Sequence, residues 1–332
     1  MTTKQNDSSL IGKKLVKRYL ARSEIGAIIM FVVLIIGFEL YSGYFLRIDN
    51  MAVIMNILPE LGIVALGVAI LMISGEFDLS VGAVFAMAPM VTCILAANGI
   101  EIWTSMIFAL ALAVAFGFIN ATLTLKFRIP SFVTTLGMMF VIRSLTVVIS
   151  GGFPPPFPED APVELFTGEL GPIRASLLWF VLLAIVTSFL MKMTNLGSWI
   201  FATGGDEVAS KNMGINTNRV KTFSFMLCSL FAGFAGILQT YRMGAALPTL
   251  GTGLELEAIA AAVIGGIALT GGVGSVLGAV LGALLIKSID NGLIVSRVDA
   301  NWFKFAIGFL TIFAVVFNSY LQRFSKKIKV EE

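Results

Sequence analysis

Residues 51–73 read MAVIMNILPELGIVALGVAILMI, a stretch of 23 residues with a single charged side chain, Glu60. About 20 apolar residues in a helix cross the roughly 30 Å hydrocarbon core of a bilayer, so this stretch predicts a membrane-spanning helix. The whole chain of 332 residues follows the same trend, because 57% of it is hydrophobic, 13% is charged and its mean hydropathy is +0.93. This composition excludes most soluble proteins and predicts a polytopic membrane protein.

Nine further apolar stretches accompany this one, and the ten together predict an all-α, polytopic membrane helix bundle of about ten transmembrane helices. Seven of the ten are cleanly separated, at 25–46, 51–73, 79–97, 102–125, 131–149, 175–191 and 222–241. The other three, at 258–269, 275–289 and 302–321, are less distinct, and the first two are glycine-rich and shorter than a straight crossing. Some helices are therefore expected to be short or broken.

The distribution of basic residues predicts the orientation of the chain. Of the 23 Lys and Arg residues, 16 fall in four segments that a ten-helix threading places on one side, at 1–24, 126–128, 192–221 and 323–329. Basic residues gather on the cytoplasmic side of membrane proteins, so both termini are expected to be cytoplasmic. The predicted organisation is a retained cytoplasmic leader at 1–24, a single transmembrane domain at 25–321 and a cytoplasmic tail at 322–332.

The loop at 150–173 is expected on the opposite, external face. Residues 151–172 contain four acids and neither Lys nor Arg, and five prolines crowd the interval 154–162. Such proline density forces extended backbone that cannot join a helix. We expect a stiff external flap, which is either a plain connector or a docking surface for another protein.

The cytoplasmic segment at 194–222 carries helix signals in its interior. Asp206 can serve as an N-cap, Glu207 then falls in the first turn, and Gly214 can end the helix in the left-handed conformation. A short helix at about 208–213 is therefore predicted beneath the membrane. An ordinary connector between two spans could contain the same capping residues. This segment, however, is far longer than most loops, which have only about 4–6 residues.

A few polar residues in apolar surroundings are candidates for the pathway of a solute. Asp78 can cap the helix that starts near Leu79, and the amide and hydroxyl groups of Asn120, Thr134 and Thr135 suit the hydroxyls of a sugar. The same groups suit hydrogen bonds between membrane helices, and the spaced glycines of several spans suit close helix packing. The candidate pathway residues are Asp78, Ser80, Asn120, Thr134, Thr135, Glu255 and Glu257.

Several chemistries have no residues to support them. The chain has no histidine, its two cysteines lie in apolar runs, and it has no glycine-rich P-loop, so we predict no catalytic residue, no metal site, no cofactor and no nucleic-acid partner. Any ATP and Mg must be bound by a partner subunit. The alternative interpretation is a proton- or sodium-coupled secondary carrier, with Glu39, Glu60, Arg143 and Asp290 as an ion relay.

The chain also contains one weak internal similarity. Residues 73–84 resemble residues 269–280, with glycines at 75 and 82 matching those at 271 and 278. Glycine-interrupted apolar segments in the two halves of a chain are typical of the central site of a transporter.

Four stretches together resemble the permease subunits of ribose-type sugar ABC transporters, which are binding-protein-dependent importers. They are SGEFDLSVG at 74–82, IPSFVTTLG at 129–137, ATGGDEVASKNMGI at 202–215 and GTGLELEAIA at 251–260, with glycine pairs at 265–266 and 271–272. The sequence departs from the family pattern at Glu76, where a small residue is expected, and at Ser131, where a proline is usual.

The resemblance implies a fold and a set of partners. The fold would have about ten helices, similar to the vitamin B12 importer type, in a bacterial inner membrane. The partners would be an ABC ATPase subunit, a periplasmic solute-binding protein and a second permease subunit, often identical, besides membrane lipid. The resemblance also implies that 204–215 is a coupling helix whose contacts with the ATPase subunit are Gly205, Asp206, Glu207, Ala209, Gly214 and Ile215.

Overall fold

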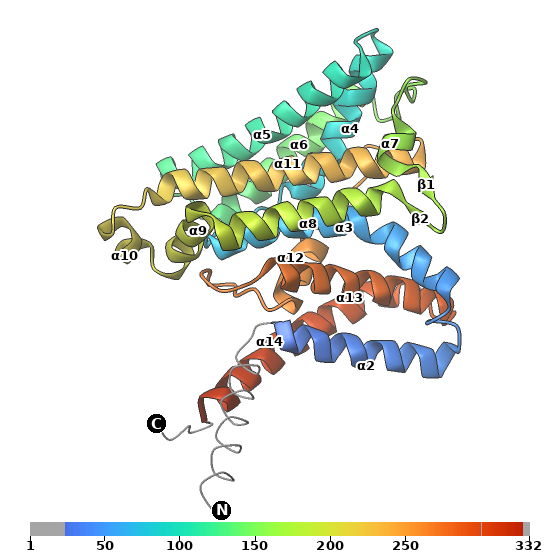
Figure 1. The fold of residues 1–332 in the computed structure, drawn as a ribbon. Helices are drawn as coiled ribbons and strands as arrows, with labels where there is room; N and C mark the ends of the chain where they lie inside the picture. The colour runs from blue at the N-terminus through green and yellow to red at the C-terminus, as the bar shows by residue number, and fades with distance from the viewer. Residues whose placement is uncertain (1–23, 300, 328–332) are drawn as a thin grey trace, which may run out of the picture.

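The computed structural model describes residues 24–299 and 301–327, so almost all of the expected leader and the last five residues of the tail lie outside it. The chain is a bundle of helices with one small sheet (Figure 1). The helices of the first half are α2 (Glu24–Ser42), α3 (Ile48–Ile73), α4 (Val81–Ala97), α5 (Ile102–Phe127), α6 (Ser131–Ser150) and α7 (Val163–Thr167). Those of the second half are α8 (Ala175–Met193), α9 (Asn195–Gly205), α10 (Glu207–Asn212), α11 (Thr217–Met243), α12 (Leu254–Ile264), α13 (Val276–Val295) and α14 (Trp302–Lys327).

Each of the ten predicted apolar stretches contains a helix, which confirms the polytopic helical bundle. Within the described ranges, seven helices are long and apolar enough to cross a membrane, namely α2, α3, α5, α6, α8, α11 and α13. Helix α4 and the apolar part of α14 are somewhat shorter. Helix α12 has only 11 residues, about 17 Å of helix, so it reaches no more than part of the way across a bilayer.

Two expected boundaries are wrong. The stretch at 275–289 is not short, because the 20-residue helix α13 continues to Val295. Its N-cap is Ser275, whose hydroxyl accepts a hydrogen bond from the Gly278 amide at 2.9 Å. The first stretch ends earlier than expected, since α2 stops at Ser42 and Gly43 turns the chain with φ of +65°.

Helix α3 forms the centre of the bundle. Every residue from Leu58 to Ile73 is buried, and α8, α11, α12 and α13 pack around it. Glycines make the closest approaches, as the spacings predict: a Cβ at Gly67 would lie 2.9 Å from the Cα atom of Cys228 in α11. Helices without a side chain at the crossing bring their backbones together, which is the usual way that membrane helices pack.

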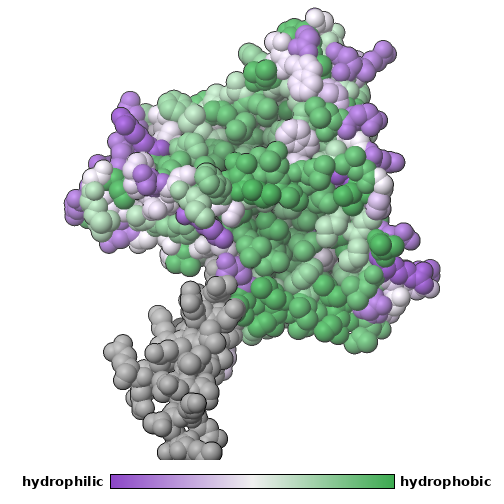
Figure 2. All heavy atoms as spheres, in the orientation of Figure 1, coloured by the Kyte–Doolittle hydropathy of each residue, from purple (hydrophilic) through white to green (hydrophobic). Residues whose placement is uncertain are grey.

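The surface of the bundle matches an apolar environment. Figure 2 shows a broad hydrophobic band across the middle of the molecule, with hydrophilic side chains gathered over the end that holds α9 and α10 and over the opposite end. Large apolar side chains of α2, α6 and α8 are exposed along this band. Because such a band requires contact with lipid, the protein is a multi-pass membrane protein.

The expected external flap is attached to the bundle and does not stand free. After the prolines, α7 places Phe166 against Trp179 of α8 at 5.3 Å between ring centroids and against Tyr241 of α11 at 5.9 Å. Strands β1 (Glu169–Leu170) and β2 (Ile173–Arg174) then form a two-stranded antiparallel sheet that leads into α8. The aromatic contacts fix this loop, which proline content alone could not predict.

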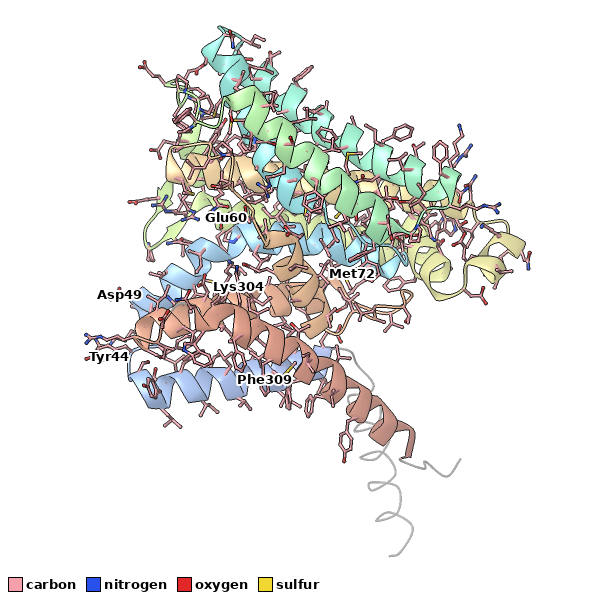
Figure 3. All side chains as sticks on the ribbon, turned by 180° about the vertical axis from the view of Figure 1, so that it is seen from behind. Tyr44, Asp49, Glu60, Met72, Lys304 and Phe309 are labelled. Carbon is pink, nitrogen blue, oxygen red and sulfur yellow. The ribbon has the colours of Figure 1, made fainter. Side chains whose placement is uncertain are left out.

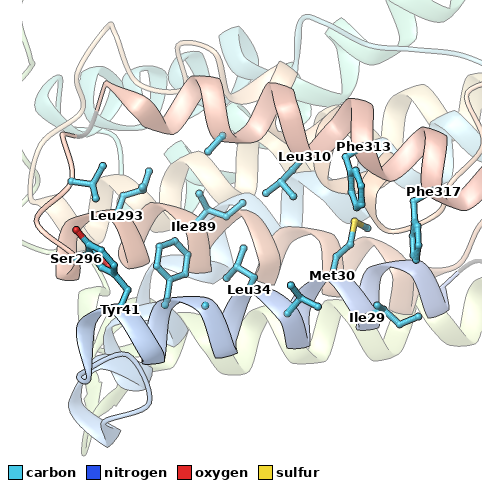
Figure 4. A pocket seen from close by; sticks show the side chains of 15 residues that line it. Ile29, Met30, Leu34, Tyr41, Ile289, Leu293, Ser296, Leu310, Phe313 and Phe317 are labelled. Carbon is cyan, nitrogen blue, oxygen red and sulfur yellow. The ribbon is translucent and has the colours of Figure 1, made fainter.

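The first and last helices pack loosely. Helices α2, α13 and α14 enclose an apolar pocket of about 670 Å³, lined by side chains such as Met30, Ile289 and Phe313 (Figure 4). The pocket has the chemistry of a lipid-facing crevice and contains almost no polar surface for a hydrophilic solute.

Candidate functional site

Four predicted pathway residues meet in one buried polar cluster beside the turn that joins α3 to α4. The Asp78 carboxylate accepts hydrogen bonds from the Ser80 amide at 2.7 Å and from the Ser80 hydroxyl at 2.6 Å. Asn120 of α5 donates to the Ser80 hydroxyl at 2.9 Å and to Asp78 at 3.3 Å. Thr135 of α6 accepts from the Leu79 amide at 3.0 Å. Because these four side chains are 0% exposed, the cluster fixes the turn and offers no open surface in this conformation.

The predicted capping role of Asp78 is wrong. Helix α4 begins at Val81 with Ser80 at the N-cap, and no side chain caps its first amides. The Asp78 carboxylate instead binds the amide two residues ahead of it, which is the geometry of an Asx-turn. The chain turns at Gly75, with φ of +91°, before it enters α4. The Asp78 carboxylate therefore stabilises the turn that precedes the helix.

The other three predicted pathway residues lie apart from this cluster. Glu255 of α12 lies against Gly82 at the start of α4. Thr134 is 8% exposed, and its hydroxyl has no hydrogen-bond partner within the described part of the chain. Glu257 pairs with a lysine of α13 at 3.4 Å. The fold therefore does not gather all seven candidates into one surface.

Arg143 of α6 anchors the loop that leads into α12. Its Nη1 atom donates to the carbonyls of Pro248 at 3.0 Å and Leu250 at 2.6 Å, and its Nη2 atom donates to the carbonyl of Gly82 at 3.1 Å. The Glu255 carboxylate lies near enough to stabilise the guanidinium charge. Since these donors are bound to backbone carbonyls, Arg143 acts as a structural clamp across three segments.

The residues proposed for an ion relay do not form a continuous chain of contacts. Glu39 accepts a hydrogen bond from the Leu46 amide at 2.8 Å at the exposed end of α2. Arg143 is bound to carbonyls, as described above. Glu60 and Asp290, in contrast, line the same cavity between α3 and α13.

The predicted short helix of the polar segment is present as α10, and both of its predicted caps are confirmed. The Asp206 carboxylate accepts a hydrogen bond from the Ala209 amide at 2.9 Å. Gly214 has φ of +84°, and its amide and that of Ile215 each donate to a carbonyl of the last helical turn at 3.0 Å. This pair of bonds is a Schellman motif, which a residue with a side chain closes only under strain.

Helix α9 precedes α10 and was missed by the sequence reasoning. It starts after Thr194, whose hydroxyl accepts a hydrogen bond from the Gly197 amide at 3.3 Å. A signal was available, because Thr194 is a favourable N-cap and apolar Leu196 and Ile200 follow at helical spacing. The segment between α8 and α11 is therefore a pair of helices.

The end of α9 contacts two turns of the membrane bundle through backbone atoms. A Cβ at Gly204 would overlap the Ile73 carbonyl and lie 2.7 Å from the Gly272 nitrogen, and the Gly272 amide donates to the same carbonyl at 2.8 Å. Gly271 lies against Gly75, so matching glycines of the two similar segments touch each other. These five residues are called the glycine junction below, and they join α9 to the turns after α3 and α12.

Lys221 of α11 joins the same parts of the molecule by charge. Its Nζ atom lies 2.8 Å from Glu76 Oε1 and 2.7 Å from Glu207 Oε2, and Glu207 also pairs with Lys211 at 2.5 Å. Hydrogen bonds from Lys211 and Lys221 lower the pKa of Glu207 from its usual 4.5 to about 2. Glu76, the departure from the family pattern, thus has a specific partner in Lys221, 145 residues away. No local pattern in the sequence predicts this pair.

An apolar bundle with a capped pair of helices joined to its inner turns defines a membrane permease of the transporter class. A family model described as the permease component of a branched-chain amino acid transport system matches residues 50–315. The chain belongs to this permease family, which is not itself catalytic.

Several import permeases are similar to this chain over most of its length. The ribose import permease of Escherichia coli strain K12 is 33% identical over 83% of this chain and 88% of its own length. The xylose/arabinose import permease of Sulfolobus acidocaldarius is 30% identical over 93% of this chain and 88% of its own. The autoinducer 2 import permease of Yersinia enterocolitica is 33% identical over 78% and 72%. No solved structure matches the chain significantly.

Proposed function

We propose that this chain is the transmembrane permease subunit of an ATP-driven ABC importer and forms the pathway for a sugar, which is a ribose-like pentose, a hexose or a related solute. The names of the similar permeases, for ribose, for xylose and arabinose and for autoinducer 2, support a carbohydrate-like solute. The observation that carries the proposal is the attachment of α9 and α10 to the inner turns of the bundle through the glycine junction and Lys221.

The proposed orientation places α9, α10 and both termini in the cytoplasm of a bacterial cell, with the permease in the inner membrane. Helices α5 and α11 are antiparallel, because Met106 contacts Tyr241 and Gly117 packs against the Phe225 carbonyl. The end of α5 that carries Lys126 therefore lies at the same end of the bundle as α10. Basic residues of both segments therefore lie at one end of the bundle, which supports the assignment of this end to the cytoplasm.

The proposed partners follow from the division of labour in such an importer. An ABC ATPase subunit would bind ATP and Mg and contact α10, and a periplasmic binding protein would deliver the solute. A second permease subunit, expected to be identical, would complete the pathway. No group of three or more His, Cys, Asp or Glu side chains that could hold a metal ion is present in the described ranges.

The surface of α10 supports a protein contact. Val208 and Met213 are 69% and 70% exposed, although both are large apolar residues on a short polar segment. The proposed contact residues lie at the end of α9, on α10 and in the turn after α10, and they are Gly205, Asp206, Glu207, Ala209, Gly214 and Ile215. An ATPase subunit that covers this surface would bury the apolar side chains and bind the caps.

Movement of α10 would reach the pathway through two rigid connections. The contacts of the glycine junction are between backbone atoms, so rotation of a side chain cannot absorb a displacement. A shift of α9 would therefore act directly on the turns after α3 and α12. Lys221 adds a charged link between Glu207 and Glu76 in the first of these turns. ATP binding and hydrolysis would then bias two packings of the bundle by binding one of them more tightly.

We further propose that the solute passes the turn before α4 and the start of α12. The residues assigned to this pathway are Asp78, Ser80, Asn120, Thr134, Thr135, Glu255 and Glu257. The support is the position of six of them. Asp78, Ser80, Asn120 and Thr135 surround the turn attached to the glycine junction, and the two glutamates lie in the first turn of the short helix α12.

Deletion of the ATPase gene tests the proposed function in cells. Sugar uptake that depends on this chain should disappear in that strain and return when the ATPase gene is restored. Uptake that persists without the ATPase would overturn the proposal and favour a gradient-driven carrier.

A further inference from the structure

A polar cavity of about 400 Å³ lies between α3, α11, α12 and α13. Ion-pairing and amide side chains from all four helices line it, namely Glu60, Gln239, Arg242, Glu257, Lys287 and Asp290. Its volume falls within the range of about 300–1,000 Å³ that is usual for small-molecule sites. The larger pocket at α2 and α14 is almost wholly apolar, so this cavity is the better host for a hydrophilic molecule.

The cavity reaches the middle of the bundle. Glu60 lies 12 residues into the 26-residue helix α3, about 18 Å from its first residue, and Figure 3 shows it between Asp49 near one end and Met72 near the other. Arg242 lies at the end of α11 that is distant from α10. Ionisable groups at this depth are costly, and they usually mark the path of a solute or an ion.

The charged groups of the cavity retain unused hydrogen-bonding capacity. Arg242 pairs with Glu60 at 2.6 Å through its Nε atom. Lys287 makes only longer contacts, 3.4 Å to Glu257 and 4.0 Å to Asp290. Glu60 is only 5% exposed, and its Oε2 atom is buried without a hydrogen-bond partner among the described residues. An unpaired buried carboxylate oxygen is costly unless a ligand binds it.

The arrangement of charges selects the class of ligand. Three carboxylates and two cations line the cavity, so acceptors and donors border the same small volume. A hydroxyl group can donate to a carboxylate and accept from an ammonium or guanidinium, and such charge-assisted bonds are stronger than neutral ones. An anion would meet an excess of carboxylates. A cation would compete with Arg242 and Lys287, which together contact all three acids.

We propose that this cavity is the solute-contact site of the permease and that it binds an uncharged polyhydroxylated molecule, with Glu60 and Asp290 as acceptors for its hydroxyls. The inference rests on the proposed function and adds the site and the recognition chemistry. Of the seven predicted pathway residues, only Glu257 lines this cavity, and Asn120 and Thr135 are buried outside it.

The test uses the complete transporter, with this chain, its ATPase subunit and its binding protein, in proteoliposomes. Uptake of labelled D-ribose, D-xylose, L-arabinose and D-glucose is measured for the wild type, Asp290→Asn and Glu60→Gln. Asp290→Asn carries little risk to folding, because its side chain is 34% exposed and its contact with Lys287 is long. Asp49→Asn is the matched control, since Asp49 is an exposed acid on α3 outside the cavity.

The site predicts that both cavity variants lose uptake by about tenfold or more, while the control keeps it. ATPase stimulation by the binding protein should persist in all variants, which shows that the complex assembles. Wild-type uptake that both cavity variants retain overturns the site and leaves the proposed function intact. A wild-type complex that transports no sugar of the panel, or that moves protons or sodium through these acids, overturns both.

Discussion

Replacement of Gly204 by Ala tests how movement of α9 reaches the bundle. A Cβ at this position would overlap the Ile73 carbonyl oxygen and lie 2.7 Å from the Gly272 nitrogen, and both are backbone atoms that cannot rotate away. Gly137 of α6 supplies a control outside the proposed contacts, because a Cβ there would have no neighbouring atom within 4 Å. Both positions lie in helices, so the helix-forming advantage of Ala over Gly is shared by the two variants.

The expected effect of Gly204→Ala follows from the overlap. Forcing a methyl group into a closed backbone contact typically costs about 1–3 kcal/mol, because one of the two segments must shift. A bias of this size between two packings of the bundle corresponds to about a 5- to 150-fold change in their populations. Gly137→Ala has open space around its methyl group and should leave the populations nearly unchanged.

The assay compares uptake with ATP hydrolysis for the two variants in the reconstituted transporter. Gly204→Ala should lower solute uptake at least about fivefold and make ATP hydrolysis independent of the binding protein, while Gly137→Ala stays within about twofold of the wild type. Membrane expression of both variants serves as the folding control. Equal behaviour of the two variants would refute the transmission of force through the glycine junction.

Four further predictions concern other parts of the molecule. Gly214→Val should raise the ATP hydrolysed per solute imported, because a β-branched residue is strained at φ of +84°, whereas Gly214→Asn, which tolerates this conformation better, should be milder; equal ratios would count against the cap. Arg143→Met should lower the thermal midpoint in detergent, and Arg143→Lys should not restore it, since one ammonium cannot span three carbonyls; full rescue by Lys would contradict the clamp. In a double-mutant cycle, Glu76→Gln and Lys221→Met should be non-additive in uptake by about 0.5–3 kcal/mol, and additive effects would exclude the charged link. Because the folded pKa of Glu207 lies at about 2, below its usual 4.5, its contribution to stability is present above pH 4.5 and is lost as the pH falls toward 2; Glu207→Gln should flatten this part of a stability profile, and an unchanged slope would contradict the pairing.

Most of the helical architecture could be predicted because hydrophobic length is encoded locally. Each apolar stretch became a helix, and the caps at Asp206 and Gly214 could be identified from single residues with known preferences. The predicted boundaries were wrong where contacts between distant segments determine them. Helix α13 extends beyond its apolar stretch, and the loop at 150–173 is held by aromatic contacts of Phe166 with two distant helices.

The candidate sites were harder to predict, because their residues come together only in the folded chain. Asp78, Ser80 and Asn120 stood out in the sequence as polar residues in apolar surroundings, yet nothing local indicated that they bind one another and are fully buried. The pairing of Glu76 with Lys221 spans 145 residues, and it turns an apparent departure from a family pattern into a specific contact. The charged residues of the spans could be identified from the sequence, but their positions around one cavity could not be predicted.

The most direct test of the central claim is labelled-sugar uptake into proteoliposomes that contain this chain, measured with and without its ATPase subunit and binding protein. The account predicts uptake that requires ATP and both partners, and no ATP hydrolysis by the purified chain alone. Uptake by the chain alone down an imposed proton or sodium gradient would contradict the account, and Glu60 and Asp290 would then be the first residues to examine as the ion path.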